Sequence, residues 1–369
     1  MSIGKKTKVL IVDDSAVVRR MIADTLSADP EIEVVGTAPD PYIARDKILE
    51  LNPDVLTLDI EMPRMDGITF LKILNQHRPM PVVVISSITQ AGSEMAMKAL
   101  EAGAVDVLAK PTSAWNLGEL KDQLAHRVKG AARARLGHNR PTTAAQNIAP
   151  PAISMRFSAR QVIVMGASTG GTEALKNVLT RLPDGLPGIC IVQHIPPVFS
   201  KAFADRLNEC CAFDVREAQH GDDVRPGLVL IAPGDYHMAL RWTGAGYKVV
   251  LERGPMQHHV RPAVDVLFDS AVCAGRDALG VLLTGMGVDG ASGMKKMKAA
   301  GAATIAQNEE TCIVYGMPKA AIELGAVDRV LPLDLIPHGI LRVLQDNANG
   351  VAPMNHQSPE QKLHTITRS

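Results

Sequence analysis

The chain has 369 residues, of which 46% are hydrophobic and 21% are charged, which is the composition of folded globular domains. This length favours two domains of ordinary size over one. Its 39 basic and 39 acidic residues cancel, which excludes a strong overall attraction to nucleic acid or to a membrane surface.

The sequence predicts neither export nor membrane insertion. The first residues, Met1 to Lys6, lack the apolar segment of a signal peptide, and no run of about 18 apolar residues could span a bilayer. The five cysteines are an odd number without C-x-x-C spacing, which argues against a zinc site and a disulfide framework. We therefore expect a cytoplasmic protein with reduced thiols and no insertion into the membrane.

The first part of the chain alternates between short apolar strands and helical patterns. Each expected strand is rich in Val, Ile or Leu and is followed by a segment with helical spacing. Five such repeats predict a parallel sheet with helices on both faces, an α/β fold. The expected strands lie at residues 7–12, 32–36, 55–58, 82–85 and 105–108.

Polar residues stand where these strands end. Because the carboxyl ends of parallel strands meet at one edge of a sheet, we expect these side chains to converge. Several carboxylates brought that close repel one another unless a hard cation joins them, and oxygen ligands suit Mg²⁺. A single Asp after a strand is usually a turn residue, but a match at several strand ends is harder to explain that way. The residues concerned are Asp13, Asp14, Asp59, Ser86 and Lys110.

These motifs resemble the receiver domain of two-component response regulators, a flavodoxin-like (βα)5 domain, which we assign to residues 1–125. The resemblance implies that Asp59 is the phosphoacceptor. It also implies that Asp13 and Asp14, together with Asp59, hold Mg²⁺ beside the backbone near Glu61. Ser86 would supply the hydroxyl that follows the phosphoryl group, and Lys110 the cation that pairs with it.

The end of the fifth strand both matches the receiver family and departs from it. Lys110 and Pro111 match its Lys-Pro pair, whose peptide bond is typically cis. Three residues before the lysine, the family often has an aromatic switch residue, and this chain has Val107. The resemblance therefore does not carry aromatic rotamer switching over to this chain.

Residues 126–159 lose the apolar periodicity and predict a flexible linker. Basic residues in its first half are followed by Pro141, Pro150 and Pro151 among polar residues. The basic half could touch nucleic acid, but neither an aromatic residue nor a DNA-reading helix accompanies the charge. We expect a soluble tether and no nucleic-acid partner. The polar stretch at 350–369 is expected to be a frayed C-terminal tail.

A second α/β unit is expected over residues 160–349. It opens with the apolar strand 162–165, which runs into the small-residue turn 166–171 around Ser168. Ser168 fits the G-x-S-x-G pattern of an activated nucleophile. A serine at this place can also cap the following helix, and a glycine-rich turn can cradle a phosphate. The turn alone does not decide between these three possibilities.

Two further residues favour the nucleophile. His194 directly follows the apolar strand 188–193, and Asp289 follows the strand 279–284, so both are expected at the same sheet edge as Ser168. A serine hydroxyl needs a base to remove its proton, and the base needs an acid to orient it. The order Ser, His, Asp differs from the Ser, Asp, His order of α/β-hydrolases, so the motif does not predict that fold.

The adjacent pair His258 and His259 is an alternative base or metal pair. Neighbouring residues on a strand point to opposite faces, and no carboxylate at metal-ligand spacing accompanies them in the sequence. This pair is therefore a weaker candidate than His194.

The segment resembles the catalytic domain of the chemotaxis protein-glutamate methylesterase (CheB) family, a doubly wound α/β domain with a mostly parallel sheet. The matching motifs are GASTGG at 166–171, QHIP at 193–196 and LTGMGVDG at 283–290. The resemblance implies that Ser168 is the nucleophile, His194 the base and Asp289 the orienting acid. Thr169 and Met286 look like residues on the oxyanion side. Val288 replaces the Asn of some relatives.

The resemblance also implies the activity. A serine hydrolase would remove methyl groups from glutamate methyl esters of methyl-accepting chemotaxis receptors and deamidate certain receptor glutamines. The histidine kinase CheA would phosphorylate the receiver, which would relieve its cover over the catalytic site. We expect Mg²⁺ in the receiver, no cofactor in the catalytic domain, and a monomer. The competing hypothesis is a response regulator whose output is binding, to DNA or as a receptor scaffold. Binding to DNA would call for a helix-turn-helix segment with a basic recognition helix, and the sequence of the second domain lacks one.

Overall fold

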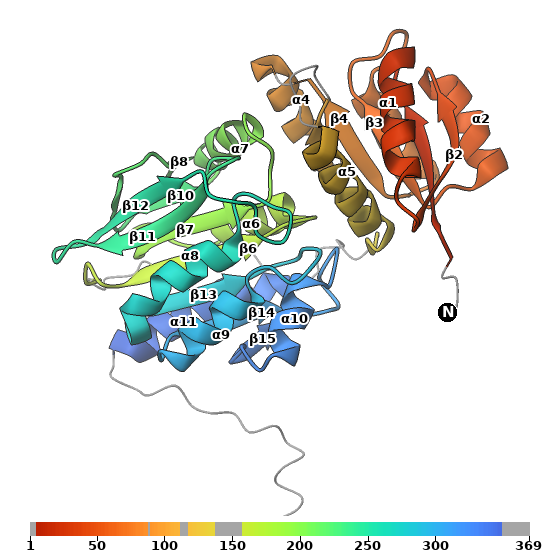
Figure 1. Ribbon diagram of the computed structural model, residues 1–369. Coiled ribbons are helices and arrows are strands. Elements are labelled where there is room, and N and C mark those ends of the chain that lie inside the picture. Colours follow the sequence, from red (N-terminus) through yellow and green to blue (C-terminus); the bar gives the residue numbers. More distant parts are fainter. Residues whose placement is uncertain (1–4, 88, 111–116, 137–156, 349–369) are drawn as a thin grey trace, which may run out of the picture.

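The computed structural model describes residues 5–87, 89–110, 117–136 and 157–348, with only the backbone for 117–122. Within them lie two α/β domains, the N-terminal one in red to brown and the C-terminal one in yellow-green to blue (Figure 1). The expected C-terminal tail, Pro111 and most of the expected linker fall outside the described residues. In the described part of the chain, no helix has the length and apolar character needed to cross a membrane.

The first domain contains a five-stranded parallel sheet in the order β2-β1-β3-β4-β5. Helices α1 and α5 cover one face of it, and α2, α3 and α4 cover the other. The strands are β1 (Thr7–Val12), β2 (Ile32–Ala38), β3 (Val55–Asp59), β4 (Val82–Ser86) and β5 (Asp106–Ala109). The helices are α1 (Ala16–Ser27), α2 (Pro41–Leu51), α3 (Gly67–His77), α4 (Gln90–Glu101) and α5 (Leu117–Ala132).

Local sequence explains where the receiver helices begin and end. Asp40 caps α2 by accepting the backbone N–H groups of Tyr42 and Ile43, and Pro41 occupies the first helical position, where no N–H is needed. The same helix ends at Asn52, which adopts the left-handed conformation with φ 47°. These signals fix the helix length and hence the point at which β3 begins.

The second domain is built on a seven-stranded sheet in the order β15-β14-β13-β6-β7-β10-β8, and every strand pair in it is parallel. Alternate residues of β6 face opposite sides: Val162 and Val164 join one buried cluster, Ile163 and Met165 another. The strands are β6 (Val162–Ala167), β7 (Gly188–Gln193), β8 (Asp214–Glu217), β10 (Leu228–Ile231), β13 (Ala278–Leu282), β14 (Ala303–Gln307) and β15 (Arg329–Leu331).

Helices cover both faces of this sheet. A small sheet packs on the same face as α8, α9 and α10. Helices α6, α7 and α11 pack on one face, and α8, α9 and α10 pack on the other. The helices are α6 (Gly171–Leu179), α7 (Phe199–Asn208), α8 (Val264–Ala271), α9 (Ala291–Ala299), α10 (Met317–Glu323) and α11 (Ile336–Ala348), with short 3-10 helices η1 (Val272–Asp277) and η2 (Leu333–Leu335). The small antiparallel sheet has the order β11-β12-β9 and contains β9 (Asp223–Val224), β11 (His237–Trp242) and β12 (Tyr247–Glu252).

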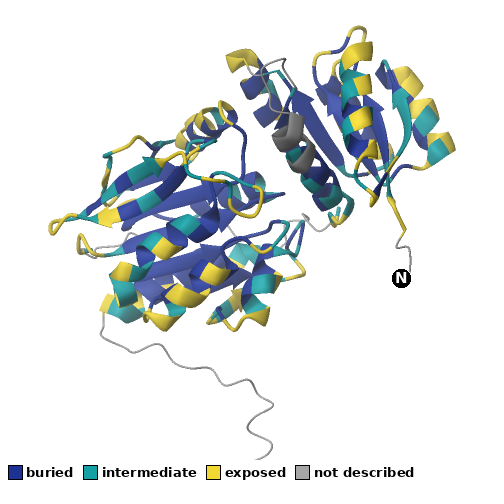
Figure 2. Ribbon diagram, in the orientation of Figure 1, coloured by how far each residue is buried: buried dark blue, intermediate teal, exposed yellow. Residues whose placement is uncertain are grey.

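The predicted fold class is confirmed for both domains. The central strands of both large sheets are buried, whereas the outer helices expose one side to solvent (Figure 2). The sequence analysis did not predict that β9, β11 and β12 form a separate antiparallel sheet. It also missed β8 and β15, because these short edge strands carry polar residues and lack an apolar run.

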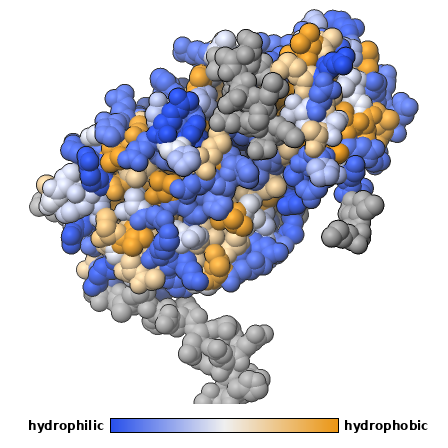
Figure 3. Space-filling view, viewed as in Figure 1, coloured by the Kyte–Doolittle hydropathy of each residue, from blue (hydrophilic) through white to orange (hydrophobic). Residues whose placement is uncertain are grey.

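The receiver packs against the catalytic domain through α4, β5 and α5. Helix α4 lies against α7, as Figure 1 shows, and Glu101 of α4 pairs with Lys176 of α6 and Arg206 of α7 at 2.9 Å each. Such part-exposed ion pairs contribute little stability, about 1 kcal/mol or less each. The outer surface seen in Figure 3 mixes hydrophilic side chains with scattered hydrophobic ones over both domains.

Candidate active site

The chain reverses its strand order at the centre of the catalytic sheet. From β6 it first moves to β7 on one side, and it later returns with β13 on the other side. Ser168 directly follows β6 and His194 directly follows β7, while Asp289 lies in the loop that leads from β13 to α9. A crevice at such a switch point is the usual ligand site of an open α/β sheet.

Ser168 is held by its backbone, and its hydroxyl does not cap a helix. Its N–H donates to the Thr284 carbonyl at 3.0 Å, and its own carbonyl accepts the Gly171 N–H at 2.7 Å. Helix α6 starts at Gly171, and its N-cap is Gly170, which has φ 75° and makes no side-chain cap. The helix-cap interpretation of Ser168 is therefore wrong, because the Ser168 hydroxyl makes no capping hydrogen bond to α6.

His194 and Asp289 form a buried pair. The Nε2 atom of His194 lies 2.8 Å from Asp289 Oδ2, and the two side chains are only 4% and 2% exposed. The first N–H groups of α8 also hold the carboxylate: Val264 donates to Oδ2 at 2.6 Å and Asp265 to Oδ1 at 2.9 Å. Asp289 thus satisfies the otherwise unpaired donors at the start of this helix.

This environment keeps Asp289 ionised. Burial alone would raise its pKa, but the hydrogen bond from His194 and the two backbone donors outweigh burial and hold the pKa below its usual value. An ionised carboxylate can only accept a hydrogen bond, so Nε2 of His194 carries the hydrogen and Nδ1 is left as the basic nitrogen. This Nδ1 atom is buried, and no group among the described residues donates to it or accepts from it.

The ring nitrogen that must take a proton from serine is therefore available. No hydrogen bond joins Ser168 Oγ to His194 within the described structure, and catalytic contacts commonly tighten only when substrate is bound. The fold thus orients His194 through Asp289, and it places Ser168, whose hydroxyl does not cap a helix, at the end of the adjoining strand.

Receiver residues contact both residues expected on the oxyanion side. The Thr169 hydroxyl donates to Oδ2 of Asp106, on receiver strand β5, at 3.0 Å. Gly130 of α5 lies so close to the catalytic loop that a Cβ there would stand 2.9 Å from Met286 Sδ and 3.4 Å from Thr169 Oγ1. In this conformation the receiver covers that side of the serine.

Arg127 of α5 completes the contact. Its guanidinium forms a buried ion pair with Asp106 and donates to the backbone carbonyl of His194 at 3.1 Å. The sequence analysis missed Asp106, Arg127 and Gly130. A charged residue inside the apolar strand VDVLA was a usable signal for Asp106, because a buried charge is found only where a partner compensates it.

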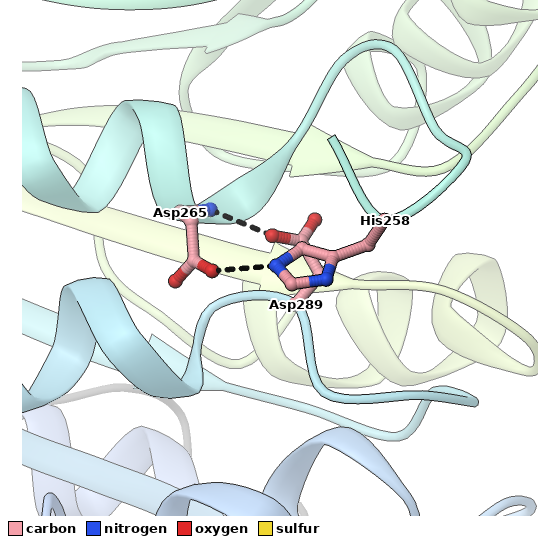
Figure 4. Close-up of side chains that lie close together, drawn as sticks. All are labelled: His258, Asp265 and Asp289. Atoms are coloured by element: carbon pink, nitrogen blue, oxygen red, sulfur yellow. Dashed lines mark hydrogen bonds and ion pairs between the residues drawn. The ribbon is translucent and has the colours of Figure 1, made fainter. Parts of the chain in front are cut away.

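The His258 alternative proves to be connected to the same site. His258 and His259 lie in a turn and not on a strand, and His258 Nε2 lies 3.1 Å from Asp265 Oδ2 (Figure 4). Ligand atoms of His258, Asp265 and Asp289 all lie within 4.8 Å of one another, so carboxylates do accompany this histidine in space. The sequence analysis missed this pairing because His258 and Asp265 are seven positions apart, which is not a recognised metal-ligand spacing.

Four of the receiver side chains predicted from the sequence, those of Asp13, Asp14, Asp59 and Lys110, come together. Asp13 follows β1 and Asp59 ends β3, at the switch point of this sheet; both are buried, and Asp14 is exposed. Lys110 Nζ lies 2.6 Å from Asp59 Oδ2 and 3.4 Å from Asp13 Oδ2. The Ser86 hydroxyl instead donates to the Gly92 carbonyl at 2.9 Å.

The carboxylates of the receiver fit a hard divalent cation. Ligand oxygens of Asp13, Asp14 and Asp59 lie within 4.8 Å of one another. Asp13 Oδ2 is buried and accepts no hydrogen bond of acceptable geometry within the described residues. Burial, with Asp13 nearby, raises the pKa of Asp59 to about 6, although Lys110 opposes this shift.

Comparison with known proteins defines the class. Residues 163–340 match the family model "CheB methylesterase", and residues 9–122 match "Response regulator receiver domain". A protein-glutamate methylesterase/protein-glutamine glutaminase of Syntrophus aciditrophicus is 54% identical over 341 residues, which cover 92% of this chain and 99% of the relative. One from Anaeromyxobacter dehalogenans is 54% identical over 340 residues, which cover 92% and 95%.

Among solved structures, the CheB methylesterase catalytic domain of Thermotoga maritima matches with 41% identity and a TM-score of 0.49. The match covers 50% of this chain and 98% of that one.

Fold and relatives together define a response regulator whose output domain is a methylesterase. The chain belongs to the CheB methylesterase family, as the resemblance in the sequence implied.

The first prediction concerns the expected catalytic triad of Ser168, His194 and Asp289. Ser168→Ala and Asp289→Asn should each lower methyl-ester hydrolysis at least about a thousandfold, since one removes the attacking oxygen and the other the acid that orients His194. Ser292→Ala, at an exposed position on α9, is the matched control and should retain activity. Wild-type rates in the Ser168 variant would show that another residue is the nucleophile.

Proposed function

We propose that this protein hydrolyses glutamate γ-methyl esters on the cytoplasmic helices of methyl-accepting chemotaxis receptors and releases methanol. The observation that carries the proposal is the placement of Ser168, His194 and Asp289 at adjoining strand ends, with the His194–Asp289 pair already formed. The printed names of relatives that are 54% identical support the substrate class.

The site residues divide the chemistry between them. Ser168 Oγ attacks the ester carbonyl while Nδ1 of His194 takes its proton, and Asp289 stabilises the imidazolium that results. Backbone donors near Thr169 and Met286 hold the oxyanion. His194 then returns the proton to the departing methoxide, which leaves as methanol. A water molecule, deprotonated by His194, then attacks the acyl-enzyme; the bond to Ser168 Oγ breaks, His194 returns the proton to Ser168, and the receptor side chain is released as a glutamate carboxylate.

The same acyl-enzyme can form from a glutamine side chain. Attack on the amide carbonyl, followed by protonation of the leaving nitrogen by His194, releases ammonia and yields the same glutamyl ester on Ser168. Deamidation of receptor glutamines is therefore the second activity proposed, in line with the glutaminase part of the relatives' names.

The receiver is proposed to control this site. Asp59 accepts a phosphoryl group from the histidine kinase CheA, and the protein acts as a cytoplasmic monomer. Asp13, Asp14 and Asp59 hold Mg²⁺, which when bound would neutralise the carboxylates and stabilise charge on the phosphoryl group. The surrounding residues do the rest: Lys110 supplies a fixed positive charge, and Glu61 donates its backbone N–H to Asp59 Oδ1 at 3.2 Å.

Contacts through β5 and α5 account for inhibition in the unphosphorylated state. Asp106 holds the Thr169 hydroxyl, Arg127 holds the His194 carbonyl, and Gly130 fits against Met286. Lys110 follows directly after β5, so a change in its pairing with Asp59 acts on the strand that carries Asp106. We propose that phosphorylation shifts the receiver away from these contacts and so exposes Ser168.

Phosphoryl control predicts a specific loss in Asp59→Asn. This variant should retain basal methanol release from methylated receptors but lose its stimulation by a small phosphodonor with Mg²⁺, because it lacks the carboxylate oxygen that accepts the phosphoryl group. Asp46→Asn, at an exposed position on α2, is the matched control. Stimulation that survives in Asp59→Asn would refute the assignment of the phosphoacceptor.

Binding of Mg²⁺ should depend on pH. Only the ionised carboxylate binds a cation, and the pKa of Asp59 is raised to about 6, so this group is mostly protonated at pH 5 and mostly ionised at pH 7. The apparent affinity for Mg²⁺ should therefore rise about tenfold between these values, as measured by isothermal titration calorimetry. The increase should be much smaller in Asp59→Asn; an equal increase there would assign it to another group.

The close approach of α5 predicts that a bulky residue at position 130 releases the receiver. Gly130→Leu places a side chain where Met286 and Thr169 now pack, and it also favours helix formation. Basal esterase activity without phosphodonor should rise several-fold to about tenfold, which corresponds to about 1.4 kcal/mol of lost contact energy.

Gly130→Ala is the graded control for this prediction. Its single added methyl meets the flexible end of Met286, which can move, so the rise should be smaller. Unchanged basal activity in Gly130→Leu would refute inhibition through this contact.

A further inference from the structure

His258 and His259 occupy the centre of a tight turn between β12 and α8. Gln257 N–H donates to the Val260 carbonyl at 3.1 Å, and Val260 N–H donates back to the Gln257 carbonyl at 2.9 Å. The two histidines have φ 51° and 63°, the pattern of a type I′ turn, which normally carries Asn-Gly. Residues with a Cβ adopt this conformation at a cost, and such strain is concentrated at functional sites.

The turn directs the ring of His258 towards Asp265. Its Nε2 atom lies 3.1 Å from Asp265 Oδ2, and the His258 side chain is 43% exposed whereas that of Asp265 is 8% exposed. In Figure 4 the imidazole lies beside both carboxylates, Asp265 and Asp289, and is joined to the first. His258 thus reaches a buried carboxylate from the surface.

Asp265 connects two helices to the catalytic acid. Its Oδ1 atom accepts the Gly293 N–H in the first turn of α9 at 2.7 Å, and its backbone N–H donates to Asp289 Oδ1 at 2.9 Å. Asp265 therefore caps α9, while Asp289, from the loop before α9, caps α8. This exchange ties the position of Asp289 to the side chain of Asp265.

Every carboxylate oxygen of this cluster already accepts a hydrogen bond, although the spacing of the cluster would suit a metal ion. Both oxygens of Asp289 accept backbone donors, and Oδ2 also pairs with His194. Both oxygens of Asp265 are occupied too, one by Gly293 and the other by His258. A cation would have to compete with these donors for the same oxygens, so the hydrogen bonds themselves account for the arrangement.

We propose that His258 is a positioning residue for the catalytic acid. Its ring holds the Asp265 side chain against α9, which fixes the first turn of α8 and the N–H groups that aim the Asp289 carboxylate at His194. The inference rests on the triad of the proposed function and adds to it a residue that reaches the reacting atoms only through others.

The groups around His194 allow a pH profile to test this role. Asp289 faces the ring from the catalytic domain, with Asp265 and His258 behind it, and Arg127 and His126 approach from receiver helix α5. Burial, together with Arg127, lowers the pKa of His126 to about 4, so this ring stays neutral in the assay range. A less well fixed Asp289 stabilises the imidazolium less, so the acidic limb of kcat should move to lower pH.

The test measures kcat, KM and the pH profile of the full chain with phosphodonor and Mg²⁺ on methylated receptor. His258→Ala should lower kcat about fivefold to tenfold, leave KM within about twofold, and shift the acidic limb downward. His258→Gln should recover most of kcat, because its amide can still donate to Asp265. His259→Ala, in the same strained turn, keeps the His258–Asp265 bond and should retain kcat.

Two results would overturn the inference: an unchanged kcat and pH limb in His258→Ala, or equal losses in the His258→Ala, His258→Gln and His259→Ala variants, which would indicate a role for the turn alone. Ser168→Ala, measured beside them, separates this failure from failure of the proposed function. If that variant is inactive while His258→Ala is normal, the triad stands and only the positioning role falls.

Discussion

The pairing of buried parallel strands places the chemistry of this molecule. In a sheet covered on both faces, backbone groups within the strands must bond to neighbouring strands, and their side chains fill the two cores. Reactive polar groups are then confined to the strand ends. Three adjacent strands, β13, β6 and β7, end at one point of the catalytic sheet, and β1 and β3 do so in the receiver. The site proposed for an acyl group and the site proposed for a phosphoryl group are both consequences of the same constraint.

That constraint also explains which site residues could be located from the sequence alone. Ser168, His194 and Asp59 stand directly at strand ends, so locating the strands sufficed to bring them to the right edges. Asp289 lies further into its loop, but locating the expected strand 279–284 brought it to the same edge as well. Contacts that depend on tertiary packing could not be predicted. The hydrogen bond between Asp106 and Thr169, for example, joins two domains across 63 positions, and neither local sequence pattern specifies this partner. The ring nitrogen that pairs with Asp289 is likewise set by packing alone.

The contact between the domains is polar at its centre. Arg127 and Asp106 are buried there with compensating partners, and their remaining hydrogen bonds go to the loops after β6 and β7. Separating an interface of this kind re-exposes charged groups to water, which solvates them well, so opening costs less than exposing an apolar surface of equal size. A polar centre of this kind therefore suits two domains that separate and rejoin, as the proposed control requires.

Strand β5 spans only Asp106–Ala109, and Lys110 follows it at once. Side chains alternate along a strand, so Asp106, Leu108 and Lys110 share one side, and Leu108 packs there in the same apolar cluster as Val128 of α5. One inserted or deleted residue within this stretch would turn Asp106 or Lys110 to the opposite side of the sheet. The length of the stretch from Asp106 to Lys110 therefore determines whether the contact with Thr169 and the pairing with Asp59 can form together.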